Sequence, residues 1–326
     1  MQSWWMQMTD DDMRLELRDA PVPEPGPRQL LVRVRAAGLN RGEFVLGHGL
    51  HGQAGSWKAI GGEAAGEVVK AGAEVTGFKP GDRVMGRCPG GFSEYALLEA
   101  AEAMAVPQAL SWEEAGSLPM TFLVTYDMLV IQGRLKAGEW LLVNGVSSGV
   151  GVSCLQLGKV LGAQVIGTSG SQEKLDALKA LGLDLGICTR GPDFAPQVLD
   201  VTGGKGADLA VNTVGGSVFA EEMRALAFEG RLAMTGYVDG QVRAEIDLEA
   251  LHAKRLTLFG VSNKLRTKAQ RAAAVPRFVA EVIPHVAAGR LKPRIDRVYD
   301  FAQLPDAKAR MEAGGHIGKI VLRAAP

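Results

Sequence analysis

Apolar and polar residues alternate along much of the first third of the chain. Residues 30–35 (Leu-Leu-Val-Arg-Val-Arg) show the alternation expected of a half-buried β-strand. Shorter strands are expected at residues 4–8, 66–70, 82–85 and 94–98, separated by turns that contain glycine and proline. Many short strands joined by such turns predict a small, irregular β-barrel.

The pattern changes near residue 111, after which strand-type and helix-type segments alternate. Residues 140–144 (Trp-Leu-Leu-Val-Asn) form a continuous apolar run that is typical of a buried parallel strand. An apolar stripe over residues 151–161 predicts the helix that follows. Further strands are expected at residues 164–168, 185–188, 207–212, 231–235 and 255–259. Six strands alternating with helices predict an α/β fold with a doubly wound parallel sheet.

The charge balance excludes several classes of protein. The chain has 326 residues, with 36 Lys and Arg against 36 Asp and Glu. We therefore expect no broad basic surface for nucleic acid or for an anionic membrane.

No run of 18 apolar residues and no secretory signal is found, so a membrane span and secretion are not expected. Three widely separated cysteines predict neither a disulfide framework nor a four-thiolate zinc site, and they suit a reducing cytoplasm.

A glycine-rich segment, Leu141-Leu-Val-Asn-Gly-Val-Ser-Ser-Gly-Val-Gly151, lies between a predicted strand and a predicted helix. Small residues there let the backbone approach a pyrophosphate at the helix N-terminus. The strict G-x-G-x-x-G pattern fails at Val146 and Ser148, so a glycine-rich turn without a ligand is the alternative on this pattern alone. The six-strand context favours a dinucleotide. The residues expected to bind it are Ser147, Ser148, Gly149, Val150 and Gly151.

The end of the second predicted parallel strand indicates which dinucleotide binds. An acidic residue there would bind the ribose 2′-hydroxyl of NAD. This chain instead has Ser169, Gly170 and Ser171, and its first carboxylate, Glu173, is followed by Lys174. Hydroxyl groups and a lysine suit a 2′-phosphate, so the sequence favours NADPH. The alternative is that Lys174 only decorates a solvated helix face.

Taken together, these motifs resemble the zeta-crystallin-like NADPH:quinone oxidoreductases, a zinc-free branch of the medium-chain dehydrogenase/reductase superfamily. The resemblance implies a GroES-like β-barrel domain over residues 1–118, a Rossmann domain over 119–263, and a return to the first domain over 264–326. It also implies a homodimer. The matching segments are Gly38-Leu-Asn-Arg41, Gly61-Gly-Glu-Ala-Ala-Gly66, Lys79-Pro-Gly-Asp-Arg-Val84, Gly90-Gly-Phe-Ser-Glu-Tyr95, the glycine-rich loop, Gly167-Thr-Ser-Gly-Ser-Gln-Glu-Lys174, Asn212-Thr-Val-Gly-Gly216 and Gly318-Lys-Ile-Val-Leu322.

The positions that hold zinc in metal-dependent relatives carry unsuitable residues here. The first of these positions matches Asn40 and the second matches Gly62, so neither offers a thiolate or an imidazole. His48 and His51 stand close together in the sequence, but two histidines without a third ligand make a poor catalytic zinc site. We therefore expect no metal, and a direct hydride transfer from the cofactor.

The resemblance also implies roles for individual residues. Asn40 and Thr125 match residues near the nicotinamide. His51 falls where the family commonly has a tyrosine, so it either delivers a proton or is an ordinary loop histidine. The remaining residues expected around the cofactor are Val214, Gly215, Gly236, Tyr237, Val261, Ser262, Asn263 and Arg266, the last of which has a surface arginine as its alternative.

The expected function is an NADPH-dependent reduction of quinones or of related conjugated carbonyl compounds such as enones, in the cytoplasm. Two alternatives stay open at this point. One is an enoyl-thioester reductase with the same fold. The other is a crystallin-like protein that binds NADPH without catalysis, in which case NADPH would raise thermal stability but no acceptor would be reduced.

Overall fold

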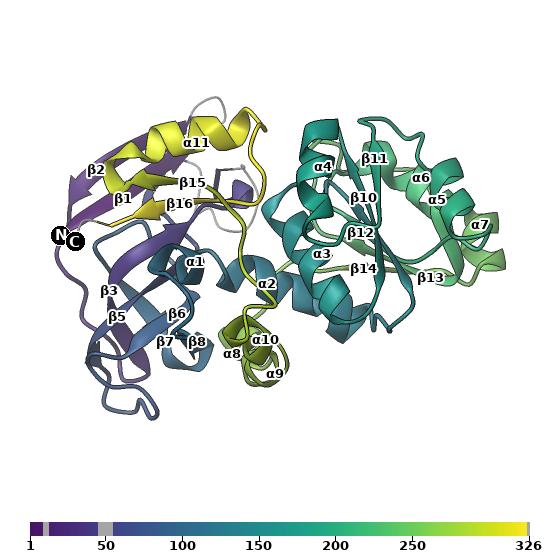
Figure 1. Cartoon of the computed structure of the whole chain (residues 1–326). Coiled ribbons are helices and arrows are strands. Elements are labelled where there is room, and N and C mark those ends of the chain that lie inside the picture. Colours follow the sequence, from purple (N-terminus) through teal and green to yellow (C-terminus); the bar gives the residue numbers. More distant parts are fainter. Residues whose placement is uncertain (9–12, 45–54, 325–326) are drawn as a thin grey trace. The chain divides into compact units, whose positions relative to one another are not determined.

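The computed structural model describes residues 1–8, 13–44 and 55–324, and these divide into two compact units. The first unit comprises Met1–Leu123 together with Asn263–Pro326, and the second comprises Val124–Ser262. Each unit has a sheet of its own and a hydrophobic core of its own. The two units are described separately below (Figure 1).

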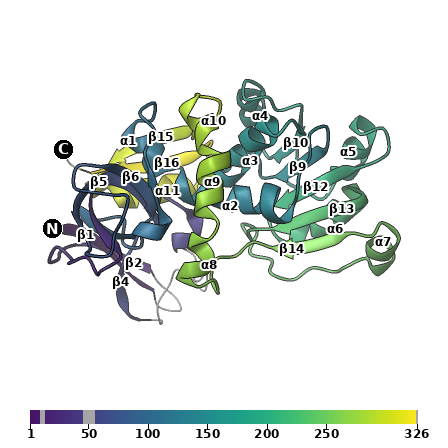
Figure 2. The ribbon, with the colours of Figure 1, turned by 90° about the horizontal axis from the view of Figure 1, so that it is seen from below.

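The second unit is built on a six-stranded sheet in which every neighbouring pair is parallel. The strand order β11-β10-β9-β12-β13-β14 reverses direction beside β9, which confirms the predicted doubly wound sheet. Figure 2 shows β12, β13 and β14 side by side. The strands are β9 (Trp140–Asn144), β10 (Gln164–Ser169), β11 (Leu185–Cys188), β12 (Ala207–Asn212), β13 (Leu226–Met234) and β14 (Thr257–Gly260).

Helices cover both faces of this sheet, with α3 and α4 on one face and α5 and α6 on the other (Figure 1). Leu142, Ile166 and Leu232 on the strands are buried in one core with Phe194 and Val198. Burial of such side chains is the main source of stability in a sheet of this kind. The helices are α3 (Gly149–Val160), α4 (Gln172–Lys179), α5 (Ala195–Val201), α6 (Gly216–Ala225) and α7 (Leu248–Ala253).

Two serine side chains determine where α3 and α4 begin. The Ser148 hydroxyl accepts a hydrogen bond from the Gly151 amide at 3.0 Å, so α3 starts two residues earlier than the apolar stripe suggested. The Ser171 hydroxyl accepts from the Lys174 amide, as its position before the second helix predicted. Four residues therefore separate the end of β9 from α3, and two residues separate the end of β10 from α4.

The first unit contains a strongly curved sheet in which β3 pairs with three different strands along its length. Its N-terminal half pairs with β7, most of its length pairs with β5, and its last residues pair with β16. A separate three-stranded sheet has the order β2-β1-β4. The strands are β1 (Gln2–Met8), β2 (Met13–Asp19), β3 (Gln29–Gly38), β4 (Trp57–Ala59), β5 (Glu63–Ala71), β6 (Arg83–Arg87), β7 (Tyr95–Glu99), β8 (Ala103–Ala105), β15 (Ile295–Asp300) and β16 (Lys319–Arg323).

The C-terminal segment adds β15 and β16 to the sheet that β3 organises. Strand β16 runs antiparallel to β3, and β15 runs parallel to β16. Short helices complete the chain. They are η1 (Arg41–Phe44), η2 (Ala100–Glu102), α1 (Trp112–Gly116), α2 (Pro119–Tyr126), the π-helix η3 (Asp127–Gln132), α8 (Lys268–Ala272), α9 (Val275–Glu281), α10 (Ile283–Ala287), η4 (Phe301–Gln303) and α11 (Leu304–Glu312).

Candidate active site

The glycine-rich turn after β9 has a backbone that other residues would not tolerate. Gly145 has a φ of 78°, in the left-handed region. A Cβ on Gly151 would collide with the carbonyl oxygen of Gly145, so this glycine lets α3 pack closely on the turn. The amides of Gly149 and Val150 lie in the first turn of α3 and have no intrahelical acceptor. This arrangement is suited to a pyrophosphate.

The end of β10 carries hydroxyl groups, and one of them lies close to this turn. The Ser147 and Ser169 hydroxyls are 3.5 Å apart, which links the glycine-rich turn to β10. Gly170 follows, and a Cβ at this position would collide with the Arg190 side chain. Ser171 caps α4, and Lys174 lies in the first turn of that helix. The end of β10 therefore has the Arg190 side chain against Gly170, and Lys174 follows in the first turn of α4.

Arg190 was not among the residues that the sequence patterns predicted. It follows β11, which is the parallel neighbour of β10, with Ser169 opposite Cys188 in the register. Because the carboxyl ends of parallel neighbours meet at one edge, an arginine two residues beyond β11 falls beside the end of β10. That spacing was a usable signal in the sequence.

Other residues expected around the cofactor lie at the C-terminal ends of β12, β13 and β14. The Asn212 side-chain oxygen accepts from the amides of Val214 and Gly215 at 2.9 and 2.8 Å, which fixes the turn after β12. Gly236 and Tyr237 follow β13, and Tyr237 is exposed. Val261 and Ser262 follow β14, the first buried and the second exposed. Asn263 and Arg266 belong to the first unit, where the Arg266 guanidinium donates to Asn263 and to the Gln270 carbonyl.

A buried carboxyl supports this edge of the sheet. Glu222 on α6 accepts a hydrogen bond from Asn144 Nδ2 at 2.5 Å and from Asn212 Nδ2 at 2.6 Å. Asn144 and Asn212 end β9 and β12, the two strands where the winding of the sheet reverses. Burial raises the pKa of Glu222 to about 8 despite these two hydrogen bonds. The group therefore holds the two strand ends together.

The Thr125 hydroxyl is buried and already has partners within the second unit. It lies 2.6 Å from the Ser153 hydroxyl and 3.6 Å from the Cys154 sulfur. The side chain has no exposed surface. Thr125 therefore connects α2 to α3, whatever else it does when a cofactor is bound.

In the first unit, Asn40 is the centre of a hydrogen-bonded cluster that also contains Glu43, Glu63 and Lys319. The Asn40 side-chain nitrogen donates to Glu63 at 3.0 Å and to Glu43 at 3.2 Å, while its oxygen accepts from Lys319 Nζ at 2.7 Å. Lys319 Nζ also donates to Glu63 at 2.8 Å and to the carbonyl oxygen of Leu39 at 2.7 Å. The Asn40 side-chain nitrogen therefore donates its hydrogen bonds to the two carboxyl groups of this cluster.

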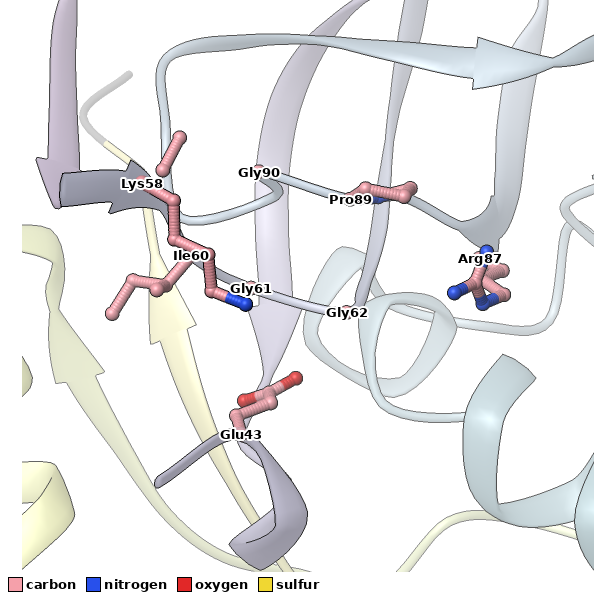
Figure 3. A pocket seen from close by; sticks show the side chains of 9 residues that line it. Glu43, Lys58, Ile60, Gly61, Gly62, Arg87, Pro89 and Gly90 are labelled. Carbon is pink, nitrogen blue, oxygen red and sulfur yellow. The ribbon is translucent and has the colours of Figure 1, made fainter. Parts of the chain in front are cut away.

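Glu43 forms part of the wall of a pocket of about 170 Å³ in the first unit (Figure 3). Its carboxyl accepts from the Asn40 amide at 3.1 Å, and burial raises its pKa to about 7. The nearby Lys319 and the hydrogen bonds from Asn40 partly offset that rise. Lys58 and Arg87 line the same pocket. His51, which the sequence predicted either to deliver a proton or to be an ordinary loop histidine, lies outside the described residues.

The residues at the positions that match zinc ligands of metal-dependent relatives do not fit a catalytic zinc ion. Any side chain larger than hydrogen at position 62 would meet the Glu43 carboxyl, because a Cβ there would lie 2.7 Å from Glu43 Oε1. The ammonium of Lys319 is bonded to Asn40, and its positive charge would repel a divalent cation. Over residues 1–8, 13–44 and 55–324, no three His, Cys, Asp or Glu side chains are grouped so that they could hold a metal.

Known protein families match segments of both units. Residues 26–108 match the alcohol dehydrogenase GroES-like domain, and residues 149–278 match the family described as zinc-binding dehydrogenase. The synaptic vesicle membrane protein VAT-1 homolog of Rattus norvegicus is 30% identical over 97% of this chain and 82% of its own length. This chain therefore belongs to the medium-chain dehydrogenase/reductase superfamily. The predicted GroES-like domain is confirmed.

Other relatives are longer or have known structures. A phenolphthiocerol/phthiocerol polyketide synthase of Mycobacterium tuberculosis is 32% identical over 94% of this chain, which spans only 14% of that protein. The structure of mycobacterial Rv1454c complexed with NADPH superposes with a TM-score of 0.89 at 26% identity, covering 99% of this chain and all of the other. A quinone oxidoreductase of Pseudomonas syringae pv. tomato DC3000 gives a TM-score of 0.86 at 30% identity, with 99% and 100% coverage.

None of the helices that the structure describes is both long and apolar enough to cross a bilayer.

Proposed function

We propose that this chain is an NADPH-dependent, zinc-independent oxidoreductase of the zeta-crystallin-like type, which reduces quinones or related conjugated carbonyl compounds. The observation that carries this proposal is the end of β10, where Ser169, Gly170 and Ser171 stand beside Lys174 and Arg190. Similarity to a quinone oxidoreductase and to a protein solved with NADPH supports it.

The residues of the second unit fit NADPH. The first turn of α3, with the amides of Gly149 and Val150, would hold the pyrophosphate. Lys174 and Arg190 would bind the 2′-phosphate through charge-assisted hydrogen bonds. When bound, NADPH supplies a hydride from its dihydronicotinamide ring.

The residues of the first unit then orient the acceptor and manage its proton. Asn40, whose side-chain oxygen accepts from Lys319, donates to the carboxyl of Glu43 in the wall of the pocket. With a pKa of about 7, this carboxyl is protonated in about half of the molecules at neutral pH. In its protonated form it can donate a hydrogen bond to a carbonyl oxygen. The proton that completes the reduction comes from solvent or from His51.

The reaction is proposed to proceed without zinc because the residues that would bind the metal are absent. Asn40 and Gly62 replace a thiolate and an imidazole, and Lys319 places a positive charge beside Asn40. A Lewis-acid mechanism needs a metal with at least three protein ligands and an open position. The described residues of the first unit provide no such set.

A panel of acceptors tests this proposal. The purified protein is mixed with NADPH or NADH in the presence of a chelator, and absorbance of the reduced cofactor is followed after addition of a simple quinone, an enone or an enoyl thioester. We expect oxidation of NADPH with the quinone or the enone. NADPH binding without turnover of any acceptor would instead support the non-catalytic, crystallin-like alternative.

An enoyl-thioester reductase is the second candidate, and the matches to segments of polyketide synthases favour keeping it. Its signature would be a kcat/KM that rises with acyl chain length and exceeds that for quinones. The resemblance further predicts a homodimer in the cytoplasm. Sedimentation velocity of the purified chain would test the dimer, and fractionation of the source cells would test the location.

A further inference from the structure

The pocket beside Glu43 contains two cationic side chains that form no ion pair with residues 1–8, 13–44 or 55–324. Lys58 on β4 and Arg87 on β6 both line it, and both are half-buried. Neither has a hydrogen bond or an ion pair with any part of the chain that the structure describes. Figure 3 shows Lys58 extending along Ile60 toward Gly61, with Glu43 facing it and Arg87 beyond Gly62.

Burial without a partner is unfavourable for both cations. Burial lowers the pKa of Lys58, and it is also the largest cause of the lowered pKa of Arg87. Arg271 and Glu102 both act electrostatically on Arg87. These two groups form an ion pair with each other at 3.4 Å, whereas Arg87 forms none with the described residues. Cations that are partly removed from water and unpaired are costly, and an anion placed between them would offset that cost.

We propose that this pocket is a subsite for a carboxylate group carried by the acceptor, which binds to the Lys58 ammonium and the Arg87 guanidinium. This inference rests on the proposed function and narrows it to conjugated carbonyl acceptors that bear a carboxylate. The guanidinium suits a planar carboxylate because it can donate two parallel hydrogen bonds.

The size and the charge of the pocket favour a carboxylate over a larger or more highly charged group. Its volume of about 170 Å³ is below the ~300–1,000 Å³ typical of pockets for drug-sized ligands. Lys58 and Arg87, in one pocket with the partly ionised Glu43, leave an excess of about one to two positive charges. A single carboxylate balances most of that excess, whereas a phosphate dianion would be repelled more strongly by Glu43.

The first experiment measures binding without any turnover. Benzoate and its neutral analogue benzamide are titrated into the wild-type chain and followed by calorimetry. We expect benzoate to bind at least 10-fold more tightly than benzamide, and Lys58→Met and Arg87→Met each to weaken benzoate by about 10-fold. The matched controls Lys70→Met and Arg28→Met, which remove exposed cations on the same unit, should bind benzoate as the wild type does.

The second experiment uses turnover. The acceptors are trans-3-benzoylacrylate and its primary amide, an enone pair that differs in one charge. Because the two differ in intrinsic reactivity, the informative quantity is the change in their ratio of kcat/KM between proteins. We expect the acid-to-amide ratio to fall about 10-fold in Lys58→Met or Arg87→Met and to stay near the wild-type value in Lys70→Met.

The outcomes separate this inference from the proposed function. Equal binding of benzoate and benzamide, or equal benzoate affinity in the wild type and both pocket variants, overturns the subsite even if NADPH reduces neutral quinones. Selective, Lys58-dependent and Arg87-dependent benzoate binding supports the subsite even if no acceptor is reduced, in which case the proposed function fails alone. Lys58→Arg, which keeps the charge, should restore most of the benzoate affinity.

Discussion

The Lys319 ammonium and the Glu63 carboxylate form a buried ion pair with a separation of 2.8 Å, although they are 256 positions apart in the sequence. Lys319 begins β16 and Glu63 begins β5, so the pair connects the C-terminal segment to the core of the first unit. Asn40 bonds to both side chains. The geometry around Glu43 therefore depends on a contact between distant parts of the chain.

The first prediction concerns this pair. Lys319→Met would leave the Glu63 carboxylate buried without its cation, and breaking such a pair costs about 3–5 kcal/mol of stability. Lys70→Met is the matched control, since its exposed pair with Glu24 is worth only about 0–1 kcal/mol. Urea unfolding of both variants measures the difference. Equal losses of unfolding free energy in the two variants would mean that the buried Lys319–Glu63 pair stabilises the fold no more than an exposed pair does.

The sequence predicted the second unit better than the first, for a physical reason. Continuous apolar strands such as residues 140–144 and helices with one apolar stripe are local patterns, and their alternation largely determines a doubly wound sheet. The strand β2 was not predicted, although Met13, Leu15 and Leu17 alternate with charged residues. That pattern could have been used, since its antiparallel neighbour β1 was predicted.

The candidate site was predicted only where its residues follow a local motif. The turn after β9 and the end of β10 belong to such motifs, whereas the Lys58–Arg87 pocket is created by pairing between strands far apart in the chain. The suggestion that the Asn40 amide contacts the cofactor could not take account of Lys319. Nothing in the sequence indicated that this lysine returns to Asn40, because β16 joins β3 only in the folded chain.

The second prediction concerns the choice of cofactor. Lys174→Ala and Arg190→Ala should each weaken NADPH binding by about 10- to 100-fold while sparing NADH, because only NADPH carries the 2′-phosphate. Lys179→Ala at the other end of α4 is the control, since Lys179 pairs with Asp176. Dissociation constants from cofactor fluorescence measure the effect. Equal losses for NADPH and NADH would show that the 2′-phosphate binds elsewhere.

The third prediction concerns stability and pH at Glu222. Its pKa is about 8 in the folded chain against an ordinary value of 4.5, so between these pH values the folded chain keeps a proton that the unfolded chain loses. Stability should therefore fall as pH rises through this window, by about 1.4 kcal/mol per pH unit from this group. Glu222→Gln should remove that component from urea unfolding curves measured between pH 5 and pH 8. Parallel curves for variant and wild type would refute the assignment.

The fourth prediction concerns the pH dependence of the carboxylate subsite. Lys319 on β16, Glu63 on β5, Lys58 on β4 and Arg87 on β6 are the charged groups around Glu43. Because Glu43 loses its proton above a pKa of about 7, it should then repel an acceptor carboxylate. The acid-to-amide ratio of kcat/KM for the benzoylacrylate pair should fall above pH 7, and it should change less with pH in Glu43→Gln. A ratio that is independent of pH in the wild type would exclude Glu43 from the subsite.

The most direct test of metal-free hydride transfer follows the hydrogen itself. The protein is dialysed against a chelator, its metal content is measured, and NADPH carrying deuterium at C4 of the nicotinamide is supplied with trans-3-benzoylacrylamide. The account predicts undiminished turnover without bound zinc and one deuterium on a carbon of the reduced product, detected by mass spectrometry. Turnover that stops on chelation and returns with zinc, or a product without deuterium from either C4 position, would contradict it.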